Sequence, residues 1–159
     1  MSFEQAVAKI PSGLFIVCTK SSKNDDAVLD GYLASWIQQV SFSPMLITLA
    51  VKQGRPSFDS IMEGEPFTVN IVGEHDKSFL KHFWKGYDPN NNVFKEVPHS
   101  ISQSGEIILT GALSHFTAKK VSSSKPGDHH LVVAEVISGE LLVQETKPNV
   151  HIRKSALDY

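Results

Sequence analysis

The sequence has few of the features that define several large protein classes. It contains one cysteine, Cys18, so no disulfide can form within the chain, and this residue follows the apolar run 14–17. Such a setting indicates a buried, unreactive thiol rather than a nucleophile. No apolar run approaches the roughly 20 residues that a membrane-spanning helix needs. Residues 1–5 lack the basic and apolar regions of a signal peptide, so we expect a cytoplasmic protein that avoids the membrane.

The chain also has no excess of positive charge. Its 15 Lys and Arg residues and 17 Asp and Glu residues give a net charge of −2, without a basic stripe. Nucleic acid is therefore not an expected partner, because neutralising its backbone requires clustered cations. The sequence contains no nucleophile-elbow, Walker or dinucleotide-binding glycine motif. The adjacent carboxylates Asp25 and Asp26 lie in a polar turn, which gives hydrolase chemistry no support.

Short runs of branched and aromatic residues are the main feature that is present, and they predict strands. The length of 159 residues and the 41% hydrophobic content fit one domain over residues 1–159 with its own core. We expect a mainly β (α+β) fold, a β-barrel with a few short helices, because a doubly wound parallel sheet needs a helix after nearly every strand. The expected strands are 14–19, 28–40, 45–51, 66–72, 107–121 and 131–143, with helices at 58–62 and 75–83 and an irregular flap at 84–99.

The first candidate site is the turn that follows the strand at 45–51. Lys52 and Arg55 bring positive charge, Gly54 permits a tight turn, and Ser57 is a good N-cap for the helix that follows. Together they suit a phosphate group. The alternative is a surface turn with two solvated cations and an ordinary cap.

The second candidate is the segment 31–41, where small and hydroxyl residues lie among strand formers. Ser35 and Gln38 could hydrogen-bond the edge of a flat heterocycle while Trp36 gives apolar cover. The alternative is an amphipathic strand with Leu33 and Ile37 in the core and its polar side chains in solvent.

The third candidate is the loop that contains Asp128, His129 and His130. Adjacent strand residues point to opposite faces, and no further ligand completes a metal set, so we expect no metal. A turn aspartate capping its own loop, beside a histidine that faces a pocket, explains this loop more simply.

The order of these pieces resembles the flavin reductase-like proteins of the FMN-binding split barrel. The resemblance runs from about Ile10 to the C-terminus. The matching stretches are Ser12-Gly13, Ala34-Ser35-Trp36, Phe42-Ser43-Pro44-Met45-Leu46, Phe67-Thr68-Val69-Asn70-Ile71, His82-Phe83, Gly111-Ala112-Leu113, Gly127-Asp128-His129 and Ala134-Glu135-Val136. The tail 153–159 is most similar to the reductase module of some flavodiiron proteins, so the chain is either a stand-alone relative or a fragment. The fold implied is a Greek-key-like split β-barrel.

The resemblance also implies a set of site residues. A flavin, FMN or alternatively FAD, is expected against one group of residues, its phosphate against a second, and a third group closes the site. The first group is Ala34, Ser35, Trp36, Ile37, Gln38, Ser41, Val51 and Phe83; the second is Lys52, Arg55 and Ser57; the third is Arg153 and Tyr159. His129 is the expected catalytic residue, positioned near the nicotinamide or flavin face.

The implied activity is an NAD(P)H:flavin reductase that transfers hydride from nicotinamide to flavin N5. The resemblance further implies a homodimer with flavin at the interface and an oxygenase or flavodiiron protein as electron acceptor. Two departures affect the nicotinamide pocket: Trp36 replaces a smaller residue, and Ser114-His115-Phe116 replaces a more apolar stretch. The alternatives are a non-reductase FMN-binding module for electron transfer or flavin storage, and an interaction domain without a cofactor.

Overall fold

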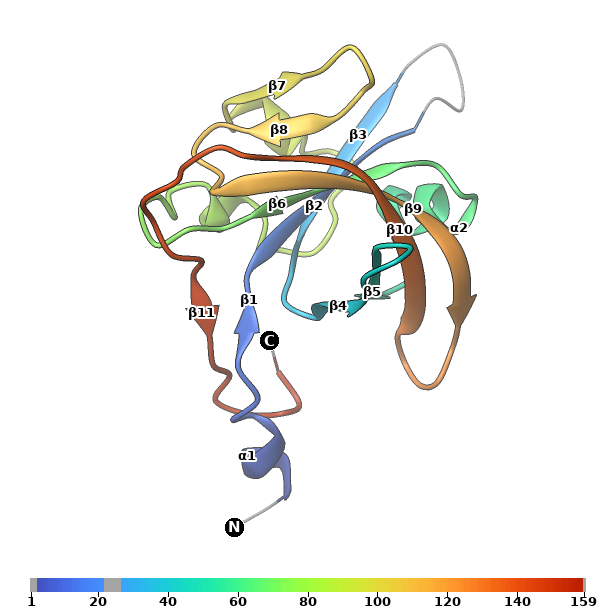
Figure 1. Cartoon of the computed structure of the whole chain (residues 1–159), viewed down its shortest axis with the longest axis vertical. Helices are drawn as coiled ribbons and strands as arrows, with labels where there is room; N and C mark the ends of the chain where they lie inside the picture. Colours follow the sequence, from blue (N-terminus) through green and yellow to red (C-terminus); the bar gives the residue numbers. More distant parts are fainter. Residues whose placement is uncertain (1–2, 22–26, 159) are drawn as a thin grey trace.

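The computed structural model describes residues 3–21 and 27–158. Within these residues the main element is a seven-stranded antiparallel sheet in the order β3-β2-β6-β9-β10-β5-β4 (Figure 1). The prediction of a mainly β fold with a few short helices is confirmed. The strands of this sheet are β2 (Phe15–Ser21), β3 (Val28–Ala34), β4 (Ile37–Ser41), β5 (Leu46–Val51), β6 (Phe67–Ile71), β9 (Ser114–Ser124) and β10 (His130–Leu141).

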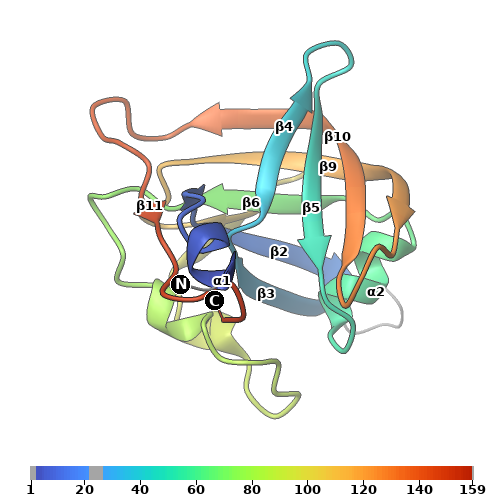
Figure 2. The ribbon, with the colours of Figure 1, turned by 90° about the horizontal axis from the view of Figure 1, so that it is seen from below.

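The two edge strands of the sheet, β3 and β4, are neighbours in sequence. Only Ser35 and Trp36 separate them, and so short a link spans roughly 10 Å at most. The sheet must therefore curl until its edges approach each other, as Figure 2 shows. No ladder pairs β3 with β4 among the described residues, so the barrel stays split at this link.

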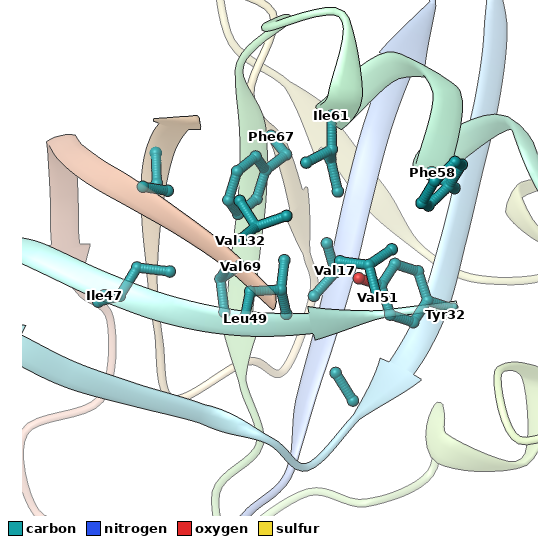
Figure 3. Close-up of a cluster of buried hydrophobic side chains, with 13 residues drawn as sticks. Val17, Tyr32, Ile47, Leu49, Val51, Phe58, Ile61, Phe67, Val69 and Val132 are labelled. Carbon is teal, nitrogen blue, oxygen red and sulfur yellow. The ribbon is translucent and has the colours of Figure 1, made fainter. Parts of the chain in front are cut away.

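The inside of the curled sheet forms the first core. In β5, buried and partly buried positions alternate, and Ile47, Leu49 and Val51 point inward. Helix α2 (Pro56–Met62) adds Phe58 and Ile61 to the same cluster (Figure 3). The two-residue period of the strands places apolar side chains on the concave face.

A second core lies against the other face of β2, which is buried on both sides. Ile16 and Cys18 pack there with Phe83, Phe94 and Leu109. Burial raises the pKa of the Cys18 thiol, as does the negative charge of Asp30. The expectation of a buried thiol is confirmed. The segment that covers this face holds the short helices η1 (Leu80–His82) and η2 (Val93–Lys95) and the hairpin of β7 (His99–Ile101) with β8 (Ile107–Leu109).

Segments near the two ends of the described chain pair with each other. The short strand β1 (Ser12–Gly13) pairs with β11 (Val150–His151), and α1 (Phe3–Val7) precedes β1. No helix of residues 3–21 and 27–158 has the length and hydropathy to cross a membrane.

Three expected elements differ from the structure. The strand 28–40 is two strands, because the chain turns at the barrel split. The helix at 75–83 is wrong: η1 alone forms there, since the apolar spacing serves irregular packing against the second core. The strand 107–121 breaks at Gly111, whose φ of 93° lies in the left-handed region. The flap at 84–99 is anchored by Phe94 and Val97, which are both buried in the second core.

Candidate functional site

The link between β3 and β4 lines a cavity of about 420 Å³ at the split of the barrel. The carbonyl of Trp36 accepts a hydrogen bond of 3.1 Å from the backbone N–H of Ala50, which fixes the link against β5. The cavity is also lined from the far ends of the chain, which the β1–β11 pairing brings here. Its lining includes Ser12, Ser35, Trp36, Ile37, Gln38, Thr48, Ala50, Leu131 and Asn149.

Two predicted residues from distant segments meet at Trp36. The Cζ of Arg153 lies 5.1 Å from the centroid of the Trp36 ring, over its face. The His129 ring stands edge-on to the indole at a centroid distance of 5.2 Å. Cations attract the electron-rich face of an indole, which explains the position of Arg153. We call Ser35, Trp36, Gln38, His129 and Arg153 the Trp36 site.

A second cavity, of about 370 Å³, is also lined by Trp36. It is lined by the β9–β10 loop, including His129, and shares Trp36, Ala50 and Leu131 with the first cavity. The Trp36 site therefore faces two adjoining hollows. Such concave surfaces with apolar and a few polar groups are typical of small-molecule sites.

The polar groups of the Trp36 site fit a flat heterocyclic ligand. The Oγ of Ser35 is buried and has no hydrogen-bond partner among the described residues, a costly arrangement unless a ligand supplies one. Gln38 is exposed on β4 and contributes to the same cavity. A ring-edge acceptor or donor would satisfy both side chains. The residues present thus fit the ring system of a flavin.

His129 and His130 have separate environments, as their alternation on a strand predicts. The Nδ1 of His129 lies 2.9 Å from the exposed Asp128 carboxylate, and this hydrogen bond and the charge of His129 hold the pKa of Asp128 below its ordinary value. His130 instead packs edge-on against Phe58, with ring centroids 4.8 Å apart. Among the described residues no three His, Cys, Asp or Glu side chains gather as a metal site.

Two of the residues predicted to bind a phosphate, Arg55 and Ser57, already bind another side chain of the protein. The Nε and Nη2 of Arg55 donate to the two carboxylate oxygens of Asp30 at 2.9 and 2.8 Å. The backbone N–H and the Oγ of Ser57 donate to Asp30 Oδ2 at 3.0 and 2.6 Å. Tyr32 lies under the guanidinium, 4.7 Å from its Cζ. We call Asp30, Tyr32, Arg55 and Ser57 the Arg55 cluster.

Asp30 is the anion that this turn binds. Burial by itself raises the pKa of the Asp30 carboxyl, but the hydrogen bonds and charge of Arg55 and the two bonds from Ser57 outweigh it and hold that pKa below its ordinary value. The expected N-cap role of Ser57 is wrong, because Arg55 is the N-cap and Pro56 begins α2. The Asp30 carboxylate satisfies the Ser57 N–H that a cap side chain would otherwise bind.

The other predicted residues lie in several places. Ala34 and Val51 are buried in the barrel core, and Ile37 packs against that core. Ser41 ends β4, where its carbonyl accepts a bond from the Gln39 side chain. Lys52 is exposed, and its charge contributes to the low pKa of Asp128. Phe83 is buried in the second core, where its ring contacts that of Phe94. Tyr159 lies outside the described residues.

Sequence reasoning missed Asp30 and the residues around Arg55. A polar cavity of about 290 Å³ borders Arg55, with Lys81, Lys85 and Tyr87 in its wall. A charged residue inside the β run at 28–34 was the available signal for Asp30, since a buried charge requires a partner. No local pattern pointed to Asn149, which reaches the Trp36 site only through strand pairing.

Known proteins share the sequence pattern and the fold of this chain. A family model described as a flavin reductase like domain matches residues 7–156. The chain belongs to this family. The suggested resemblance is therefore confirmed over nearly the whole sequence, and the split-barrel fold with it.

The matching relatives are much longer proteins. The chain is 33% identical over 157 residues to a putative diflavin flavoprotein A 6 of Nostoc, covering 98% of this chain and 27% of that protein. It is 33% identical over 153 residues to diflavin flavoprotein A 1 of Synechocystis, covering 95% of this chain and 26% of that protein. The chain thus spans about a quarter of these relatives.

Solved structures show the same fold. The styrene monooxygenase flavin reductase of Pseudomonas putida S12 superposes with a TM-score of 0.81 at 22% identity, covering 97% of this chain and 94% of that one. The NADH:FAD oxidoreductase of Streptomyces globisporus gives a TM-score of 0.80 at 20% identity, covering 93% and 86%. A structure of that oxidoreductase holds NAD and FAD fragments.

Proposed function

We propose that this chain is an NAD(P)H-dependent flavin reductase that binds FMN at the Trp36 site. The observation that carries the proposal is the convergence of Trp36, His129 and Arg153, three residues from separate segments, on two adjoining cavities. The unpartnered, buried Oγ of Ser35 supports it independently. Family membership supplies the reaction class.

Each residue of the site has a proposed task. A flavin held by Ser35, Gln38 and Trp36 would supply hydride-acceptor chemistry toward a reduced nicotinamide. Ser35 and Gln38 would hydrogen-bond the ring edge, and Trp36 would exclude water from one side. Arg153 places positive charge beside the site, which would favour negative charge on the ring. His129, which Asp128 orients, would position the nicotinamide. No side chain needs to act as a strong acid or base.

We further propose a cytoplasmic homodimer with the flavin site near its interface. The support is an open groove of about 860 Å³ over β4, β5, β9 and β10, which exposes apolar side chains. Met45, Ile137 and Leu141 are each about half exposed there, and such contiguous apolar surface is typical of an interface. The electron acceptor we propose is an oxygenase or a flavodiiron protein. Sedimentation at two protein concentrations tests the dimer.

An absorbance spectrum tests the central proposal. The purified protein is mixed with FMN or FAD, freed of oxygen, and titrated first with NADH and then with NADPH. A bound flavin that bleaches establishes the reductase and identifies its donor. A bound flavin that stays oxidised contradicts the reductase and favours the electron-transfer or storage module. If neither flavin binds, the proposal is wrong altogether.

The role of His129 has its own test. We expect His129→Ala to slow flavin reduction about tenfold, because the nicotinamide loses its positioning contact, while the flavin dissociation constant stays the same. His130→Ala is the matched control, since His130 packs against Phe58. An unchanged reduction rate in His129→Ala would remove His129 from the mechanism.

A further inference from the structure

We infer that this protein selects flavins by their ring and not by their phosphate, because Asp30 already occupies the phosphate-binding groups. Riboflavin and FMN should then bind with similar affinities. This inference rests on the proposed function and names the class of flavin that the site accepts. It makes Asp30 a specificity-determining residue.

The hydrogen-bonding capacity of the Arg55 cluster is almost fully used. Arg55 donates from Nε and Nη2 to Asp30, and Nη2 donates also to the carbonyl of Gly31 at 2.8 Å. Ser57 is fully buried, and its Oγ lies 3.0 Å from Thr19 Oγ1 besides donating to Asp30. Among the described residues, only Nη1 of the Arg55 guanidinium is left for a ligand. A phosphate would therefore have to displace Asp30 to gain a bidentate contact.

The charge of the cluster opposes a phosphate as well. Arg55 and Asp30 together carry no net charge, so a phosphate attracted by the guanidinium is also repelled by the adjacent carboxylate. Arg55 cannot readily swing away from Asp30. Its guanidinium lies over the rings of both Tyr32 and Tyr87, with Cζ at 4.7 and 6.0 Å from the two ring centroids. The Arg55 guanidinium and the Ser57 hydroxyl thus stabilise the fold and are not available to a phosphate.

Of the residues predicted to bind the phosphate, Lys52 is the cation that remains exposed to solvent. Exposed ion pairs are screened by water and salt, so Lys52 should favour FMN over riboflavin by at most about fivefold. The Trp36 site, in contrast, is proposed to contact only the flavin ring. Its buried Ser35 hydroxyl and its indole surface are equally available to riboflavin and to FMN.

The test compares the dissociation constants of riboflavin and FMN, measured by flavin fluorescence, in three proteins. In the wild type, we expect the two constants to agree within tenfold. In Asp30→Asn, which removes the competing charge with little change in shape, we expect FMN affinity to rise at least tenfold relative to riboflavin. Glu74→Gln is the matched control. Asp30 lies near the start of β6, because Thr19 pairs with both Asp30 and Phe67, whereas Glu74 lies beyond the other end of β6. The ratio of the two constants in Glu74→Gln should therefore equal that of the wild type.

Lys52→Gln keeps the inference testable if Asp30→Asn folds poorly, because Lys52 is exposed and lies outside the Asp30–Arg55 pair. Both constants are measured in one preparation, so the fraction of unfolded protein cancels in their ratio. We expect the FMN preference of Lys52→Gln to fall by at most about fivefold, and a loss of tenfold or more would overturn the inference. A wild-type preference for FMN above tenfold, or an unchanged ratio in folded Asp30→Asn, would overturn it too. If neither flavin binds the wild type, it is the proposed function that fails.

Discussion

The Trp36 site and the Arg55 cluster are built from the same kinds of residue but differ in what is left for a ligand. Each has an arginine against an aromatic ring and a buried serine. In the Arg55 cluster the serine and the arginine both bind Asp30. In the Trp36 site the serine hydroxyl has no partner among the described residues. A buried carboxylate thus turns a potential anion site into a structural one.

The largest expected effect is the loss of stability in Asp30→Ala. This change leaves Arg55 mostly buried without its charge partner and removes the one carboxylate oxygen, Oδ2, that accepts both hydrogen bonds from Ser57. Breaking a buried ion pair from one side costs about 3–5 kcal/mol. Urea unfolding measures the change. A loss below about 1 kcal/mol would show that the cluster is not structural.

The same carboxylate should make the protein acid-sensitive. The folded-state pKa of Asp30 is lowered, so its contribution to stability is present above the ordinary aspartate pKa of about 3.9 and is lost as pH falls through the folded value. We expect the difference in unfolding free energy between wild type and Asp30→Asn to shrink below about pH 4. Chemical unfolding between about pH 2 and pH 6 measures this difference, and a constant difference would contradict the assignment.

Trp36 should matter for the flavin and not for the fold. Replacing it in Trp36→Phe weakens the contact with Arg153, and we expect flavin affinity to fall about tenfold. Trp84→Phe is the control, because Trp84 is also an exposed tryptophan. In this variant Trp36 is the one remaining tryptophan. Flavin should still quench the fluorescence of Trp84→Phe. Equal loss of affinity in both variants would exclude Trp36 from the site.

The smallest expected effects come from replacing the buried serine of each site, Ser35 and Ser57. Ser35→Ala should change the unfolding free energy by less than about 0.5 kcal/mol, because its hydroxyl makes no hydrogen bond to residues 3–21 and 27–158. It should nevertheless weaken flavin binding about threefold to tenfold. Ser57→Ala loses bonds to Asp30 and should cost about 1–3 kcal/mol. Thermal unfolding and flavin titration of both variants measure the contrast, and a reversed order would contradict it.

Much of the fold follows from local patterns. The run of apolar and branched residues at 45–51 predicted β5, which spans Leu46–Val51. The turn residues at 52–57 predicted a helix after the strand, but α2 begins at Pro56, two residues before the expected start. The helix expected at 75–83 failed because helical spacing of apolar residues also suits an irregular segment on a flat apolar surface.

The sequence by itself determined the residue types of the site, their order and the mainly β architecture, because strand alternation and turn chemistry act over a few neighbouring residues. Only the tertiary structure decided which charges meet. Asp30 and Arg55 are 25 residues apart, and Trp36 meets His129 and Arg153 only because the sheet curls at the split. Electrostatic pairing depends on distance in space and on burial, neither of which a local pattern specifies.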